Sequence, residues 1–147
     1  MFHVLLVWLM NRRELQELPR TRLHEAAILL AAQCYRGAYY LAGYAVECAL
    51  KACIARKTRR HDFPNKDKVF KSYTHDLKQL VNVAELQRSL SQEVKSSRQF
   101  NINWAIVKDW SEESRYQLAV TPQGAQDLYV AITNRHNGVL RWIRGHW

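Results

Sequence analysis

The sequence predicts an all-α fold, an antiparallel up-down bundle of about four to five helices. Apolar residues recur at helical spacing along most of the 147-residue chain. No segment shows the sustained apolar and polar alternation that is typical of a half-buried strand. A chain of this length is typical of a single domain and is long enough to bury a hydrophobic core without disulfides or metal. We therefore expect a single helical domain over residues 11–147.

The segment from Arg36 to Arg60 is the most regular of the expected helices. It contains no proline, is rich in alanine, and ends in cations that offset the negative end of the helix dipole. One of its faces is small and apolar, which favours close packing. The neighbouring face carries five polar or aromatic residues: Arg36, Tyr40, Tyr44, Glu47 and Lys51.

Glu47 and Lys51 are an acidic and a basic residue one turn apart inside this otherwise apolar helix. Their spacing fits two interpretations. In the first, a partly buried ion pair helps to fix how the helices pack. In the second, the pair belongs to a cleft or a dimer groove in which Tyr40 and Tyr44 offer ring faces and hydroxyls.

The segments on either side of this helix alternate between helical and polar patterns. Residues 11–18 predict a short helical turn that Pro19 interrupts or restarts, and residues 20–35 predict the first long helix. The polar residues 61–73 predict a loop, after which Thr74 is the expected N-cap of the next helix.

The second half of the chain predicts a helix over 84–98, a short helix or packed connection over 100–110 and a polar turn over 111–116. Thr121 and Pro122 supply an N-cap and a first helical position for a closing helix that continues to the end of the chain. Its apolar stripe also includes a histidine: Ala125, Leu128, Tyr129, Ile132, His136, Val139 and Ile143.

Charge and cysteine content narrow the classes of protein that fit. Lysine plus arginine exceed aspartate plus glutamate by 22 − 13 = 9, which favours an anionic partner such as a nucleotide or nucleic acid, or serves solubility alone. Cys34, Cys48 and Cys53 are an odd number without CxxC spacing, so we expect reduced thiols that act as small core residues in a cytoplasmic protein. No Cys and His set has zinc-ligand spacing, and we expect no metal or other cofactor.

Residues 1–10 form an apolar N-terminal extension. The run is too short to span a bilayer, and it lacks both a basic start and a small-residue cleavage site. Two interpretations remain. Either the extension packs on the bundle or on a partner, or translation starts at Met10 and the extension lies upstream of the natural start.

Candidate chemistry is limited to basic and histidine residues, because no nucleophilic triad, phosphate-binding glycine loop or catalytic carboxylate pair is evident. An arginine precedes a histidine by five positions twice, at Arg56 to His61 and at Arg141 to His146. Such a pair can clamp a phosphate and move a proton. The first also fits a solvated helix end. His75 could pair with a neighbouring helix, and a capping or packing role is more common than a catalytic one.

Three motifs resemble the HEPN domain family, named for higher eukaryotes and prokaryotes nucleotide-binding. They are the alanine, glutamate and leucine-lysine pattern over 45–51, Thr-His-Asp-Leu at 74–77, and Trp110 followed by Ser-Arg-Tyr at 114–116. The resemblance runs from about residue 10 to the end and includes the long closing helix. It implies an antiparallel helical bundle that dimerises through a groove between protomers.

The resemblance implies two lines of function. Many HEPN proteins are metal-independent endoribonucleases that use an arginine and a histidine, and here Arg141 and His146 would take these roles. Others bind nucleotides, often beside a nucleotidyltransferase partner. The Arg141 to His146 pair lies on the last turn of the chain, where helices fray, so we rank nucleotide or RNA phosphate binding first.

The resemblance assigns the ligand site to seven residues: Tyr40, Tyr44, Glu47, Lys51, His75, Arg115 and Tyr116. Lys51 and Arg115 would meet phosphate, and the tyrosines would stack or donate hydrogen bonds. We expect a homodimer that acts in a toxin–antitoxin or defence setting. The third alternative is a non-catalytic antitoxin or scaffold that binds a protein partner through the apolar N-terminus and the tryptophans.

Overall fold

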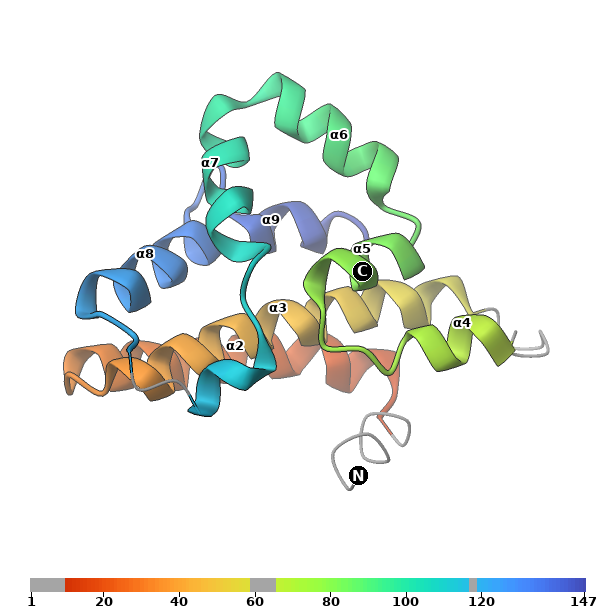
Figure 1. Ribbon diagram of the computed structural model, residues 1–147. Helices are drawn as coiled ribbons and strands as arrows, with labels where there is room; N and C mark the ends of the chain where they lie inside the picture. Colours follow the sequence, from red (N-terminus) through yellow and green to blue (C-terminus); the bar gives the residue numbers. More distant parts are fainter. Residues whose placement is uncertain (1–9, 59–65, 117–118) are drawn as a thin grey trace.

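The computed structural model describes residues 10–58, 66–116 and 119–147, without the side chain of Arg115. Within these ranges the chain is all-α and contains no strand, so the predicted fold class is confirmed (Figure 1). The apolar segment 1–9, the basic residues 59–61 and the first part of the predicted loop lie outside the described residues. The elements are α2 (Arg12–Ala31), α3 (Tyr35–Lys57), α4 (Lys66–Lys71), α5 (Leu77–Val83), α6 (Gln87–Ser96), α7 (Arg98–Val107), η1 (Glu112–Tyr116), α8 (Pro122–Thr133) and α9 (Val139–Arg144).

Helices α2 and α3 form an antiparallel hairpin that serves as the base of the bundle (Figure 1). A capping box opens α2, in which the side chain of Asn11 accepts from the backbone N–H of Glu14 and the Glu14 carboxylate accepts from that of Asn11. The turn between the helices places Gln33 at a φ of 61°, and Cys34 N then donates to Leu29 O at 2.8 Å. This left-handed C-cap reverses the chain within three residues.

Pro19 does not interrupt the first helix, contrary to the sequence prediction. It lies inside α2, which continues unbroken on both sides. Proline removes one hydrogen bond and crowds the preceding turn, at a cost of about 3 kcal/mol. Pro19 is buried on the same face as Leu15, Leu23 and Ala26, so packing of this stripe on the rest of the bundle offsets the cost.

Helix α3 is the central helix of the bundle. It packs against α2, α5, α8, α9 and η1. All residues from Ala45 to Ile54 are buried, including Glu47 and Lys51 of the predicted polar face, whereas Arg36 is exposed and Tyr40 and Tyr44 are half-buried. A helix that is surrounded in this way needs small residues where neighbours approach, and its alanines and Gly43 supply them.

The segment between α3 and α5 differs from the prediction in two respects. Part of the expected loop is helical, because residues 66–71 form α4. The N-cap of α5 is Asp76 rather than Thr74: the Asp76 carboxylate accepts from the backbone N–H groups of Lys78 and Gln79, at 2.9 and 3.2 Å. Thr74 supports this cap, since its hydroxyl accepts from Asp76 N. The carboxylate is the stronger acceptor for the positive end of a helix.

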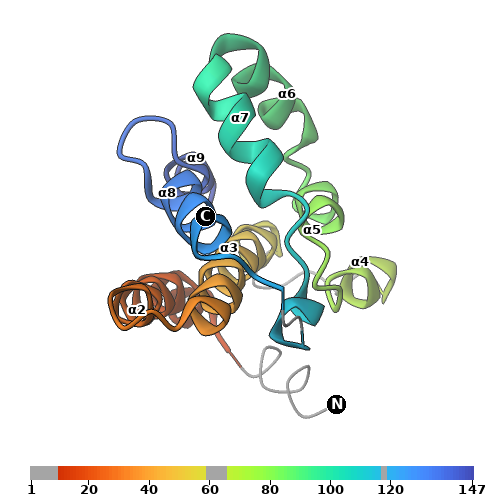
Figure 2. The ribbon, with the colours of Figure 1, turned by 60° about the vertical axis from the view of Figure 1, so that its left-hand side comes forward.

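Helices α6 and α7 form a second hairpin above the base (Figures 1 and 2). The predicted helix over 84–98 is shorter than expected. Glu85 adopts a φ of 58°, so the backbone reverses before α6 begins. At its other end, Ser97 has extended backbone and caps α7 by accepting from Phe100 N. Of the two alternatives predicted for 100–110, a short helix or a packed connection, the structure has the helix, α7, which spans 98–107.

The closing helix is divided in two, and the single long helix predicted from the sequence is wrong. Thr121 caps α8 as expected, but the side chain of Asn134 accepts from the backbone N–H groups of His136 and Asn137 and ends the helix. A Cβ at Gly138 would lie 2.4 Å from Asn134 O, so this tight turn requires glycine. His136 is exposed in the turn rather than part of an apolar stripe.

The core contains most of the described tryptophans. The ring of Trp142 packs edge-on against Phe100 and Trp104, with ring centroids 5.7 and 6.3 Å apart. Trp110 is also buried. These side chains stabilise the bundle rather than forming an exposed surface for a protein partner. Among the described helices, none is long and apolar enough to cross a membrane.

Candidate functional site

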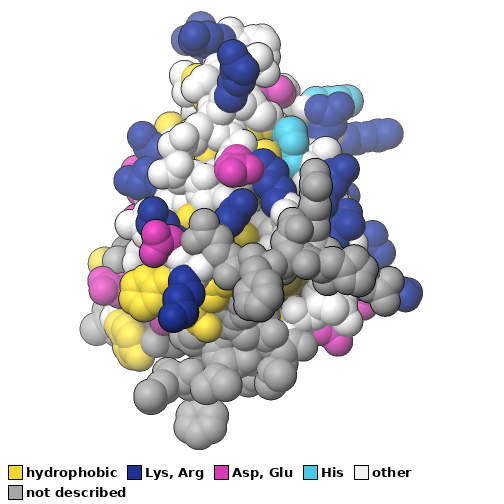
Figure 3. Space-filling model, turned by 90° about the vertical axis from the view of Figure 1, so that its right-hand side faces the viewer, with side chains coloured by type: hydrophobic (Ala, Val, Ile, Leu, Met, Phe, Trp, Pro, Cys, Tyr) yellow, Lys and Arg dark blue, Asp and Glu magenta, His cyan; other side chains and the backbone are white. Residues whose placement is uncertain are grey.

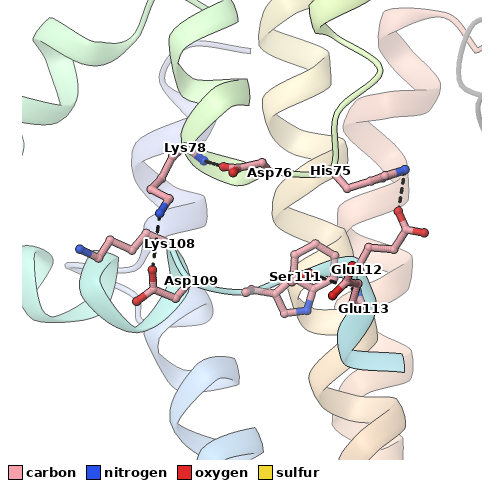
Figure 4. A pocket seen from close by; sticks show the side chains of 9 residues that line it. His75, Asp76, Lys78, Lys108, Asp109, Ser111, Glu112 and Glu113 are labelled. Carbon is pink, nitrogen blue, oxygen red and sulfur yellow. Dashed lines mark hydrogen bonds and ion pairs between the residues drawn. The ribbon is translucent and has the colours of Figure 1, made fainter. Parts of the chain in front are cut away.

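The candidate site is a cluster of charged side chains that joins three elements. On α3, Lys51 Nζ donates to Glu47 Oε1 at 2.9 Å. The same carboxylate oxygen lies 2.7 Å from His75 Nδ1, in the segment before α5. The other ring nitrogen, His75 Nε2, lies 2.6 Å from Glu112 Oε2 in η1. Figure 4 shows His75 reaching toward Glu112 from the opposite side of the cleft.

Local geometry places each member of this charged cluster. Glu47 and Lys51 share a helix face because they are four residues apart. His75 immediately precedes the N-cap Asp76, so the start of α5 positions its ring. Glu112 opens η1, which packs against α3. The prediction that His75 pairs with a neighbouring helix is therefore confirmed.

The cluster holds a deeply buried carboxylate in its charged form. Glu47 exposes only 1% of its side chain. Burial by itself raises the pKa of Glu47, but the hydrogen bond from His75 and the charge of Lys51 outweigh it, and the pKa lies below its usual value. A neutral imidazole carries one N–H, so only the doubly protonated ring of His75 can donate to both carboxylates. In that form, two cations balance two carboxylates.

An aromatic layer adjoins the cluster. The rings of Tyr40 and Tyr44 are stacked at 6.1 Å with an interplanar angle of 12°, and Tyr40 also contacts Trp110 at 6.2 Å. Trp110 lies directly on the backbone of α3, since a Cβ at Gly43 would be 2.2 Å from Trp110 Nε1. Burial first, and then the neighbouring Cys48 and Glu47, raise the pKa of Tyr44 above its usual value.

Three buried polar atoms have no hydrogen-bond partner among the described residues: Glu47 Oε2, Trp110 Nε1 and Ser114 Oγ. They belong to α3, to the segment after α7 and to η1, the elements that meet at the cluster. An unsatisfied buried polar group is costly, so these three atoms do not stabilise the contact between η1 and α3.

Two clefts flank the aromatic layer, and their chemistry differs. The first has a volume of about 380 Å³ and brings His75, Lys78 and Lys108 together with four carboxylates, from Asp76, Asp109, Glu112 and Glu113. The second, of about 710 Å³, lies at the turn between α2 and α3 and has no carboxylate among its described lining residues. These are Gln33, Cys34, Tyr35, Arg36, Gly37, Tyr40 and Val120.

The structure brings together some of the seven predicted ligand residues and separates others. Glu47, Lys51 and His75 meet directly, with Tyr44 beside them. Lys51 exposes only 7% of its side chain and therefore lies beneath the surface, not at the entrance of a groove.

The remaining ligand residues lie at the edge of the cluster. Tyr40 lines the second cleft, and Tyr116 in η1 is exposed. Arg115 also lies in η1, but its side chain is outside the described part of the chain. Whether Lys51 and Arg115 face one groove thus stays a prediction.

The two residues of the ribonuclease alternative have separate partners. Arg141 Nη1 donates to His136 O at 2.9 Å, whereas His146 Nε2 lies 3.0 Å from Ser89 Oγ on α6. Burial, together with the charges of Lys57 and Arg56, lowers the pKa of His146 below its usual value. A neutral His146 fits its position as acceptor from the serine hydroxyl.

Basic side chains lie at the end of the bundle where α3 ends and α4 begins. Figure 3 shows lysine and arginine side chains along one edge of this face. Basic residues of these two helices include Arg56 and Lys57 in the last turn of α3 and Lys66, Lys68 and Lys71 on α4. Lys57 and Lys68 both contact Glu85, so part of this charge is neutralised. These basic residues are not among the described lining residues of the second cleft.

Two important residues of the site were missed by the sequence analysis. Glu112 was assigned only to a polar turn, and Trp110 to a short helix or packed connection and to a family motif, without a contact to the site. A glycine one turn before Glu47, with a tryptophan later in the chain, signals close packing but does not identify which aromatic ring packs there. Glu112 carries no local signal, because its partner His75 belongs to another element.

Fold and site define the chain as an all-α bundle with a buried charged cluster that borders the first of two clefts. Comparison of the chain with protein-family models, with curated proteins and with solved structures gives no match. Membership of the HEPN family therefore stays a prediction from the sequence motifs. Among the described residues, no group of three or more histidine, cysteine or acidic side chains could hold a metal ion.

Proposed function

We propose that the chain binds a nucleotide, or a nucleotide unit of an RNA strand, in the second cleft. The observation that carries the proposal is the lining of this cleft, in which Tyr35, Tyr40 and Arg36 meet without a carboxylate among the described residues. Aromatic rings stack on bases of any sequence, and a guanidinium binds phosphate through two parallel N–H groups. The first cleft, in which carboxylates outnumber cations, is the poorer phosphate site.

The surroundings of Tyr40 favour a stacking role. Its ring contacts Tyr44 and Trp110, and Trp110 in turn packs against Gly43. An aromatic side chain that is already ordered loses little conformational freedom when a base stacks on it. The charged cluster then has a supporting role, because Glu47 and Lys51 hold the α3 segment on which Tyr40 and Tyr44 lie.

Arg36 is placed to meet a phosphate. It lies in the first turn of α3, where the positive end of the helix dipole adds to its charge. The N-cap residue Cys34 makes no side-chain hydrogen bond to this end of the helix. Within the proposal, Arg115 and Tyr116 remain candidate contacts at the edge of the site, since η1 packs against α3.

The proposal includes a partner and a setting, which rest on the resemblance. A cytoplasmic homodimer with a nucleotidyltransferase as a second partner, in a toxin–antitoxin or defence system, follows from the HEPN motifs. Exposed apolar side chains on two helices that pack together, Ile102 and Ile106 on α7 and Val130 on α8, are the surface that we assign to a second copy. Light scattering of Ile106→Glu against the unmodified chain tests this assignment.

Binding is tested with fluorescently labelled ATP, GTP and a short single-stranded RNA at two salt concentrations. We expect salt-sensitive binding of at least one probe, weakened about tenfold by Arg36→Gln, as for loss of one charge-assisted contact. Arg88→Gln is the matched control, because Arg88 is exposed on α6 and lies outside the cleft lining. Absence of salt-sensitive binding, or an equal loss in both variants, contradicts the proposal.

A further inference from the structure

We propose that Glu47, His75 and Glu112 form a proton-controlled latch, in which the doubly protonated ring of His75 ties η1 to α3 and loss of one ring proton releases Glu112. The latch joins residues from three separate elements through one imidazole. It is a conformational device beyond ligand binding. Only its effect on affinity rests on the proposed function.

The number of protons on the His75 ring determines how many hydrogen bonds it can donate to the two carboxylates. His75 Nδ1 and Nε2 lie 2.7 and 2.6 Å from carboxylate oxygens, which accept but do not donate hydrogen bonds when ionised. The imidazolium donates at both nitrogens. A neutral ring has one N–H, and its bare nitrogen would face the other carboxylate as a second acceptor. One of the two ties must therefore be lost when the proton leaves to solvent.

Burial decides which tie is lost. Glu47 exposes 1% of its side chain, whereas Glu112 exposes 23%. Without the imidazole, Lys51 would be the remaining donor to Glu47 Oε1 and no water could replace the lost hydrogen bond, whereas the partly exposed Glu112 can turn to water. The remaining N–H therefore stays with Glu47, and the contact between His75 and Glu112 opens, whatever other contacts Glu112 makes.

Histidine is the residue type in this neighbourhood that ordinarily changes charge between pH 5 and 8. The other charged groups come from four elements around the ring. They are Glu47 and Lys51 on α3, Asp76 and Lys78 at the start of α5, Lys108 and Asp109 at the end of α7, and Glu112 and Glu113 in η1. Among these, Lys78 and Asp109 form a loose pair of their own at 3.8 Å.

Opening of the latch would affect the proposed nucleotide cleft through residues that precede and follow η1 in the chain. Trp110 precedes η1 and contacts Tyr40, and Val120 follows η1 and lines the cleft. Ser114 Oγ and Trp110 Nε1 have no hydrogen-bond partner among the described residues, so these two atoms add no hydrogen bond between η1 and α3. Release of η1 would thus make Tyr40 and Val120 in the cleft less ordered and weaken nucleotide binding.

Hydrogen exchange followed by mass spectrometry tests the latch without any ligand. The readout is protection of residues 111–116, where Ser114 N donates to Ser111 O, with exchange times corrected for intrinsic rates. In the unmodified chain we expect protection to fall about tenfold or more between pH 6 and pH 8.5, since one charge-assisted hydrogen bond is lost. His75→Gln should show low protection at both pH values.

Two further variants keep the test decisive. His136→Gln alters an exposed histidine in the turn after α8 and should retain the pH dependence of the unmodified chain. If His75→Gln does not fold, Glu112→Gln removes the more exposed carboxylate, leaves Glu47 in place and should abolish the pH dependence. Equal protection at both pH values in the unmodified chain, or a pH dependence that persists in Glu112→Gln, overturns the latch.

Nucleotide titration at both pH values separates the latch from the proposed function. Affinity that falls together with protection supports coupling, and affinity that is unchanged while protection falls overturns the coupling. Absence of nucleotide binding at pH 6, with a pH-dependent protection of η1, contradicts the proposed function and leaves the latch intact.

Discussion

Glu47 Oε1 lies 2.7 Å from His75 Nδ1, although the two residues are 28 positions apart and belong to different elements. Lys51 donates to the same oxygen, so Glu47 forms both an ion pair within α3 and a tie to the segment before α5. The pair is a buried ion pair, as in the first interpretation of its spacing, and its effect on helix packing stays a prediction. It also lies under a histidine that reaches the cleft, which connects it with the second interpretation.

Replacement of Glu47 by glutamine should be strongly destabilising. The substitution keeps the shape but leaves the buried ammonium of Lys51 without its counter-ion, and breaking a buried pair in this way costs about 3–5 kcal/mol. Urea titration monitored by circular dichroism gives the change in the free energy of unfolding. The matched control is Glu17→Gln, which breaks the exposed pair with Arg13 and should change stability by less than about 1 kcal/mol. Equal losses of unfolding free energy in the two variants would show that burial does not determine how much an ion pair contributes to stability.

Acid should destabilise the fold partly through Glu47. Because its pKa is lowered in the folded state from 4.5, the unfolded chain binds more protons than the folded one over that range. Its contribution is therefore fully present above about pH 4.5 and is lost as the pH falls through the folded-state pKa. Unfolding free energies measured between about pH 3 and 7 should have a shallower pH dependence in Glu47→Gln than in the unmodified chain. An unchanged slope argues against a charged Glu47 in the core.

Gly43→Ala should destabilise the bundle by about 1–3 kcal/mol, because the new Cβ would lie 2.2 Å from three atoms of the Trp110 ring. Gly37→Ala is a close control in the same helix. There the nearest atom is the end of the flexible Leu29 side chain at 3.2 Å, and the gain in helix propensity of up to about 1 kcal/mol can appear. Thermal unfolding of both variants decides the point. A tolerated Gly43→Ala would mean that Trp110 does not pack on α3 as described.

Only one of the three cysteines should react quickly with a thiol reagent in the folded protein. Cys34 is exposed, whereas Cys48 and Cys53 are buried, and burial raises the pKa of each buried thiol to about 12. Timed reaction with a chromogenic disulfide should therefore show one fast thiol in buffer and three in denaturant. Cys34→Ser should remove the fast phase. Two fast thiols in Cys34→Ser would contradict the burial of Cys48 and Cys53.

Cysteine burial also corrects the sequence analysis at one position. Cys48 and Cys53 are small core residues, as predicted, but Cys34 lies exposed at the start of α3. Alanine-rich sequence surrounds all three, so local composition does not distinguish them. The distinction arises because residues 32–34 form the turn of the α2–α3 hairpin.

The sequence by itself determined the features that depend on spacing along one helix. The helical state of most of α3, the cap at Thr121 and the pairing of Glu47 with Lys51 follow from helical geometry and need no knowledge of the fold, although α3 ends at Lys57 rather than at the predicted Arg60. Tertiary structure decided whether Pro19 ends a helix, where the closing helix divides, and which ring covers Gly43. It also brought Glu112 to His75. These features depend on which faces pack together, and packing energies of several kcal/mol exceed the local preferences that a sequence pattern records.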